Sequence, residues 1–170
     1  MNSREKSSTV LIGVAIVLVT TTVPYLTMLN VFLFSGIFLA GLFALTVSIM
    51  RYQVRLSYNE AFVLGFFAGV LGGILSEGAA WLLMEYAGYR PGTESLALVI
   101  GWVLDMARDK PELQDQVQAL LEAEKLALAP ISLSWRDILA SMLFSAAFYA
   151  PIAGVGGMLA VFRLKRKARR

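Results

Sequence analysis

Residues 61–84 read AFVLGFFAGVLGGILSEGAAWLLM, and Glu77 is the only charged residue among them. A run of this length can cross a bilayer as one helix, because about 20 apolar residues span the hydrocarbon core. A carboxylate there costs roughly 2.5 to 3.5 kcal/mol on insertion scales, so it is by default functional or partnered. Gly65, Gly69 and Gly73 recur every fourth residue and share one helix face with Glu77. The stretch predicts a transmembrane helix whose glycine face is turned toward protein.

The composition of the whole chain points to a membrane location as well. Of its 170 residues, 58% are hydrophobic and 16% are charged, whereas about 25% of the residues of soluble domains are charged. A soluble domain could not cover so much apolar surface with so few charges, so we expect the lipid bilayer to be the solvent for most of the chain. We therefore predict an all-α integral membrane protein that forms a single domain over residues 1–170.

Four transmembrane helices are predicted. The apolar stretch over residues 9–50 is about twice as long as one bilayer crossing, so it must fold back on itself. Pro24, Tyr25 and Asn30 are the residues best suited to the turn. The predicted spans are residues 9–28, 31–50, 61–84 and 138–162.

Two of these helices have a capping pattern at their start. In Ser57-Tyr-Asn-Glu60 the serine side chain can accept a hydrogen bond from the glutamate amide, which satisfies a free N–H of the first turn. Ser134-Trp-Arg-Asp137 offers a similar start. Both patterns predict where the third and fourth spans begin.

Basic residues are concentrated at three places. Ten of the fifteen Lys and Arg lie at the N-terminus, within residues 51–55 or in the last eight residues. Four crossings place all three clusters on one side of the membrane, which the positive-inside rule identifies as the cytoplasm. We predict a bacterial inner-membrane protein with both termini cytoplasmic. The C-terminal cluster can also contact anionic lipid headgroups; it consists of Arg163, Lys165, Arg166, Lys167, Arg169 and Arg170.

An extracytoplasmic insert, residues 87–135, separates the third and fourth spans and holds seven acidic and four basic residues. Residues 96–104 are apolar but too few to cross a bilayer, which favours an interfacial or re-entrant helix. We expect Pro111 to start a second, amphipathic helix that lies on the outer surface of the bundle or on a partner. Its apolar stripe consists of Leu113, Val117, Leu120, Leu121 and Leu128.

The order of these segments is shared with a known family. The pattern is an N-terminal apolar hairpin and then a motif of the form Leu-Ser-Tyr-x-Glu-Ala-Phe, here Leu56 to Phe62, that leads into a glycine-rich third helix. An acidic amphipathic insert and a last helix ending in basic residues, here Arg163 to Arg170, complete it. The chain thereby resembles a family of four-helix membrane proteins of unknown function that is common in Bacteroidetes and their relatives. The resemblance implies the architecture and brings no catalytic residues.

Small residues also recur at every fourth position on the second and fourth predicted spans. They let helix backbones approach closely, and van der Waals packing then drives helix association in lipid. We expect these faces to pack within the chain or to dock against other membrane subunits. The positions are Gly36, Ala40, Ala44 and Ser48 on the second span and Ala146, Ala150 and Gly154 on the fourth.

Three roles are open for Glu77. It should be level with Ser145 and near Thr20–Thr22, and a neutral carboxyl group bonded to such hydroxyls would hold the bundle in register. Alternatively, it pairs with a cation on another subunit, because no Lys or Arg lies inside a predicted span. The third role is a proton or cation relay, although relays normally use several ionisable groups.

The sequence contains neither cysteine nor histidine. Thiolate chemistry, disulfides, the commonest transition-metal ligand and the usual base at neutral pH are therefore excluded. We predict no catalytic residue, cofactor, metal site or nucleic-acid binding. The predicted function is a non-catalytic accessory or scaffold subunit of a larger membrane complex. The alternative is a small proton- or cation-coupled transporter that acts as a homo-oligomer through Glu77.

Overall fold

The computed structural model describes residues 1–107, 114–129 and 134–167, and the regular structure in these ranges is entirely helical. Four of its helices are long and apolar enough to span a membrane, so the predicted all-α class and the four candidate spans are confirmed. The helices are α1 (Ser3–Thr22), α2 (Met28–Val31), α3 (Ser35–Tyr52), α4 (Tyr58–Ala87), α5 (Thr93–Ala107), α6 (Gln114–Leu128) and α7 (Trp135–Lys167). Residues 108–113, which include the predicted helix start at Pro111, lie outside the described ranges.

The first long helix ends at Thr22 rather than at Met28, the end of the predicted span. The cause is Pro24, because a proline pushes the residue before it out of the helical region, and Val23 is indeed extended. Tyr25 then adopts a left-handed conformation with φ of 63°. The turn therefore occupies residues 23–34 and contains α2, and α3 starts at Ser35 instead of residue 31.

Asn30 ties the two sides of this turn together. Its side-chain amide donates a hydrogen bond to the backbone carbonyl of Thr20 at 2.9 Å. Its side-chain oxygen accepts one from the backbone N–H of Ile37 at 3.2 Å. Both bonds are made to backbone groups at helix ends, where the regular bonds of the helix run out; the Ile37 N–H also donates to the carbonyl of Phe34 at 3.0 Å. A Cβ at Gly36 would lie 2.5 Å from the same asparagine oxygen, so the turn requires glycine there.

The predicted capping hydrogen bonds are formed at the starts of α4 and α7. The Ser57 hydroxyl accepts a hydrogen bond from the Glu60 amide at 3.2 Å, and the Glu60 carboxylate accepts one from the Ser57 amide at 2.8 Å. Ser134 and Asp137 form the same reciprocal pair at 3.3 and 3.0 Å. Each helix consequently begins about one turn before the predicted span.

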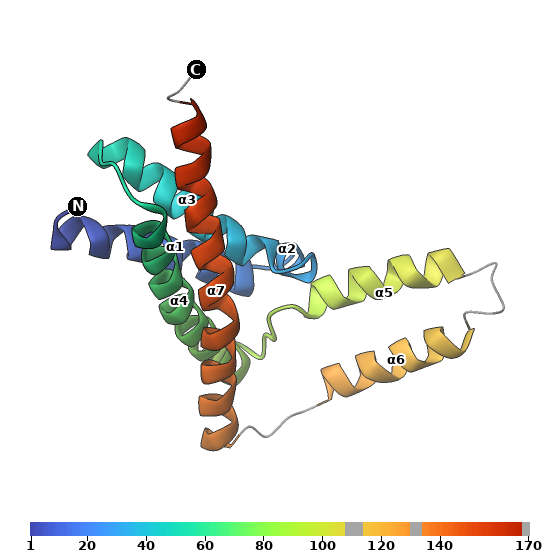
Figure 1. The fold of residues 1–170 in the computed structure, drawn as a ribbon. Coiled ribbons are helices and arrows are strands. Elements are labelled where there is room, and N and C mark those ends of the chain that lie inside the picture. Colours follow the sequence, from blue (N-terminus) through green and yellow to red (C-terminus); the bar gives the residue numbers. More distant parts are fainter. Residues whose placement is uncertain (108–113, 130–133, 168–170) are drawn as a thin grey trace.

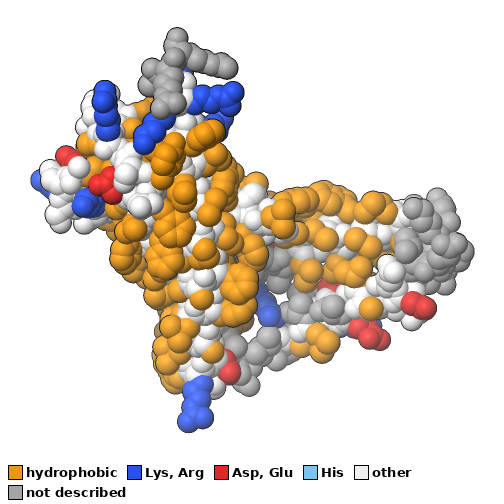
Figure 2. Space-filling model, in the orientation of Figure 1, with side chains coloured by type: hydrophobic (Ala, Val, Ile, Leu, Met, Phe, Trp, Pro, Cys, Tyr) orange, Lys and Arg blue, Asp and Glu red, His pale blue; other side chains and the backbone are white. Residues whose placement is uncertain are grey.

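The four long helices form a bundle in which α1, α4, α7 and α3 are neighbours in that order, with α3 again beside α1. In Figure 1, α7 runs along the front while α1 and α3 cross behind it. The contact between α4 and α7 is the most extensive. Val17, Ile37 and Leu45 are fully buried in the core, and Figure 2 shows hydrophobic side chains over much of the outer surface of the bundle.

Glycine makes the close contact between α4 and α7 possible. A Cβ placed on Gly65, Gly69 or Gly73 would come within 3.0 Å of the α7 backbone, closer than real Cβ atoms approach. The other predicted interface residues are also covered inside the chain: Ala40 and Ala44 are fully buried, and Gly154 lies against the Phe62 ring. These small-residue faces are thus occupied by the protein's own helices. Some glycines outside the predicted stripes also pack closely against neighbouring helices: Gly13, Gly41, Gly72 and Gly156.

The insert forms a helical hairpin that projects sideways from the bundle (Figure 1). The apolar side of α6 packs on α5, with Val117, Leu120 and Leu121 half-buried. In the described residues α6 therefore lies against α5 and not on the surface of the bundle, and the other predicted position, on a partner, stays a prediction. Of the other two predicted stripe residues, Leu113 lies outside the described ranges, as does the side chain of Leu128.

Replacing Gly69 by leucine should lower the stability of the bundle by about 1 to 3 kcal/mol or prevent folding, because overpacking forces a well-packed contact apart. Thermal unfolding of the purified protein in detergent measures this. Gly101→Leu is the matched control, since a Cβ there would meet nothing within 4 Å. Equal melting temperatures of Gly69→Leu and wild type would contradict the assigned interface.

Candidate functional site

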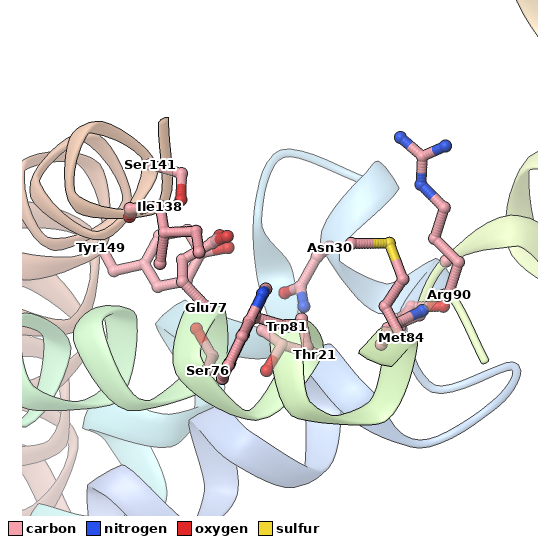
Figure 3. Close-up of a pocket in the computed structure, with 14 residues that line it drawn as sticks. Thr21, Asn30, Ser76, Glu77, Trp81, Met84, Arg90, Ile138, Ser141 and Tyr149 are labelled. Carbon is pink, nitrogen blue, oxygen red and sulfur yellow. Dashed lines mark hydrogen bonds between the residues drawn. The ribbon is translucent and has the colours of Figure 1, made fainter. Parts of the chain in front are cut away.

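A cavity of about 400 Å³ lies between α4, α7 and the segment that joins α1 to α3. Glu77 forms part of its wall, and several uncharged polar side chains surround it (Figure 3). Trp81, Met84 and Ile138 supply apolar walls. The polar lining consists of Thr21, Thr27, Asn30, Ser76, Ser141 and Tyr149. The cavity is therefore a polar site inside a predominantly apolar bundle.

A hydrogen bond across the α4–α7 contact holds the Glu77 side chain. The buried hydroxyl of Ser145 donates to Glu77 Oε1 at 2.6 Å. Within the described ranges, Oε2 has no hydrogen-bond partner, and Figure 3 shows the carboxylate beside the Tyr149 ring. One oxygen is thus held by protein and the other is available to the cavity.

The structure brings together some of the residues that the sequence placed at one depth. Thr21 lines the cavity with Glu77, whereas Thr20 and Thr22 are not part of the lining; the hydroxyls of all three donate to carbonyls of their own helix. Sequence reasoning missed Asn30 and Tyr149 as parts of the site. Tyr149 had a usable signal, because it follows Ser145 by one helical turn and therefore lies on the same face.

Arg90 also lines the cavity, from the loop that follows α4. Figure 3 shows its guanidinium on the far side of the labelled residues and turned away from Glu77. The loop is ordered by the Thr93 hydroxyl, which donates to the Arg90 carbonyl at 2.9 Å. Beside it, the Tyr89 hydroxyl donates to Glu94 at 3.2 Å, and burial together with this bond raises the pKa of Tyr89. Tyr89 therefore stays a donor at neutral pH.

The basic residues form a second candidate site at the other end of the bundle. The Tyr52 hydroxyl donates to Ser8 at 3.1 Å, which joins the end of α3 to the start of α1. Lys165 Nζ lies 4.4 Å from the centre of the Tyr58 ring, which joins the end of α7 to the start of α4. The three basic clusters of the sequence consequently meet at one end, where Figure 2 shows Lys and Arg gathered.

Four members of the predicted basic tail, Arg163, Lys165, Arg166 and Lys167, belong to the described part of α7. Arg169 and Arg170 lie outside the described ranges. No group of three or more acidic side chains that could hold a metal ion occurs in the described ranges.

No protein-family model, curated protein or solved structure matches this chain significantly. The resemblance to the four-helix family of unknown function stays a prediction. The chemistry of the cavity and of the basic end therefore has to be inferred from this chain's own residues.

Proposed function

We propose that the protein is a non-catalytic accessory or scaffold subunit of a larger bacterial inner-membrane complex. The observation that carries this proposal is the hairpin of α5 and α6, which extends from the bundle (Figure 1) and leaves large apolar side chains exposed. Helices of this length are marginally stable in isolation. An uncovered apolar patch on a projecting element is typical of an interaction site.

The hairpin offers a better docking surface than the small-residue faces, because those faces are covered within the chain. Trp102 is 49% exposed, Met106 66% and Leu126 73%. Within the described ranges, α5 touches α2 and α6, and neither α5 nor α6 makes a comparable contact with the long helices. A hydrogen bond between the hydroxyls of Thr27 and Ser95 fastens the base of the hairpin. The rest of it is free to bind another subunit.

The four long helices are proposed to anchor the protein in the membrane. Large apolar side chains on their outer surface remain exposed, among them Phe67, Leu143 and Phe144, and these suit contact with lipid tails. The gathering of basic residues at one end supports a cytoplasmic location for that end, because positive residues are retained on the cytoplasmic side during insertion. The same end suits anionic headgroups.

Charges introduced into the apolar surface of the hairpin should detach the partner. We expect the double variant Met106→Glu and Leu126→Glu to insert and fold normally but to lose the subunits that co-purify with wild type in mild detergent. Native mass spectrometry of the tagged protein measures this. The matched control is Gln118→Glu, which adds a charge at an exposed polar position of the same hairpin.

Two results would overturn the docking proposal. One is recovery of the wild-type protein only as a free monomer across several extraction conditions. The other is an unchanged set of partners in the double variant.

Reporter fusions test the proposed orientation. A fusion at the C-terminus should report a cytoplasmic location, because the basic clusters lie at that end. A fusion near Gln118 should report an extracytoplasmic location, because one proposed crossing, α7, separates it from the C-terminus. Alkaline phosphatase and green fluorescent protein activities distinguish the sides. The reverse pattern would refute the orientation.

The second candidate function is a proton- or cation-coupled transporter, and the Glu77 cavity is the observation that favours it. Transporter sites are typically built from interrupted helices and repeated halves, whereas α7 continues through Pro151 and α4 continues past Glu77. A single acidic residue is also a poor relay. The geometry therefore supports the accessory role better.

Glu77→Gln separates the roles of this side chain. Glutamine keeps the shape and most of the hydrogen-bonding capacity, so a structural Glu77 predicts little change in melting temperature or in co-purifying subunits. If Glu77 pairs with a cation of another subunit, the variant leaves that charge unpaired at a cost of about 3 to 5 kcal/mol, and the partner is lost. Cation flux into proteoliposomes that depends on Glu77 would instead establish the transporter.

A further inference from the structure

We propose that the Glu77 cavity is a binding site for a small organic cation, an alkylammonium ligand whose charged nitrogen sits between the Glu77 carboxylate and the Trp81 ring. The proposal is independent of the docking role of the hairpin. It follows from the charge, the aromatic wall and the size of the cavity.

The first support is the carboxylate of Glu77, of which one oxygen accepts a hydrogen bond. Ser145 occupies Oε1, and in the described ranges Oε2 has no hydrogen-bond partner. An ammonium group carries donors and no acceptor, so it complements a carboxylate oxygen that lacks one. Charge-assisted bonds of this kind are roughly twice as strong as neutral ones. The hydroxyls of Ser141 and Tyr149, which line the same space, supply further acceptors for the remaining N–H groups.

The second support is the aromatic wall. Trp81 lies one helical turn after Glu77 on α4 and lines the same cavity. Its ring packs against that of Trp135, with centroids 5.6 Å apart. The face of a tryptophan ring attracts cations, and the attraction grows when water is excluded. An aromatic wall suits an organic cation better than a metal ion, which needs a shell of oxygen ligands.

The third support is the size and polarity of the space. A volume of about 400 Å³ falls within the usual range of ligand pockets, about 300 to 1,000 Å³, and far exceeds a bare ion. Ala80, Met84 and Ile138 line it and can cover a short hydrocarbon chain. Arg90 is turned away from the carboxylate (Figure 3), so its charge does not occupy the position assigned to the ammonium group.

Titration calorimetry of the purified protein in detergent tests the site with n-butylammonium chloride, at constant sodium chloride concentration. We expect saturable binding that 1-butanol, a neutral analogue of similar size, and butyrate, its anionic counterpart, do not reproduce. Glu77→Gln should weaken the binding at least tenfold, and Trp81→Leu should weaken it severalfold. Glu85→Gln is the matched control, because this exposed glutamate of α4 is not part of the cavity lining, and it should bind as wild type does.

Three outcomes overturn the assignment. Equal binding of butylammonium and 1-butanol would mean that the cavity recognises only the hydrocarbon part, and preference for butyrate would assign the site to anions. Unchanged affinity in Glu77→Gln would move the site elsewhere. If Glu77→Gln fails to fold, the Trp81→Leu variant and 1-butanol decide the question. Unchanged affinity for butylammonium in Trp81→Leu, or equal binding of 1-butanol by the wild type, then overturns the assignment.

Discussion

The close approach of α4 and α7 is the constraint on which the rest of the structure depends. It exists because Gly65, Gly69 and Gly73 present no side chain to the α7 backbone, where even a methyl group would clash. Small residues serve this purpose in membranes because water is absent there and packing itself has to hold helices together. The same contact brings Ser145 within 2.6 Å of Glu77. The only charged side chain in residues 61–84 is therefore placed by the glycines that precede it.

Polar groups in the bundle are sorted between its two ends. The basic clusters meet at the end where α1 and α4 begin, whereas Glu77 and the hydroxyls around it lie toward the end where α7 begins. Asn30 belongs to the second group, because it bonds to the backbones of α1 and α3 and also lines the cavity. The Asn30 side chain thus both stabilises the turn between α1 and α3 and lines the cavity.

The two proposed surfaces serve different kinds of partner. The hairpin of α5 and α6 exposes large apolar side chains such as Met106, which suit another protein subunit. The cavity is small and combines one carboxylate with a tryptophan ring, which suits a compact cation. Two segments join them in the described residues: Thr27 lines the cavity and bonds to Ser95 at the base of α5, and Arg90, Pro91 and Gly92 line the cavity directly before α5 begins.

The sequence by itself determined the helical class, the four candidate spans and the caps at Ser57 and Ser134, because length, hydropathy and capping are local properties of the chain. It did not determine the end of α1, because Pro24 ends the helix before the apolar stretch ends. It also did not determine the position of α6, because an apolar stripe can pack on any apolar neighbour. Only the tertiary structure decided that the glycine faces are covered inside the chain. It alone placed Asn30 and Arg90 in the lining of the Glu77 cavity, because such a site is assembled from segments distant in sequence. Periodicity along one helix carries no information about which loop or turn will lie beside it.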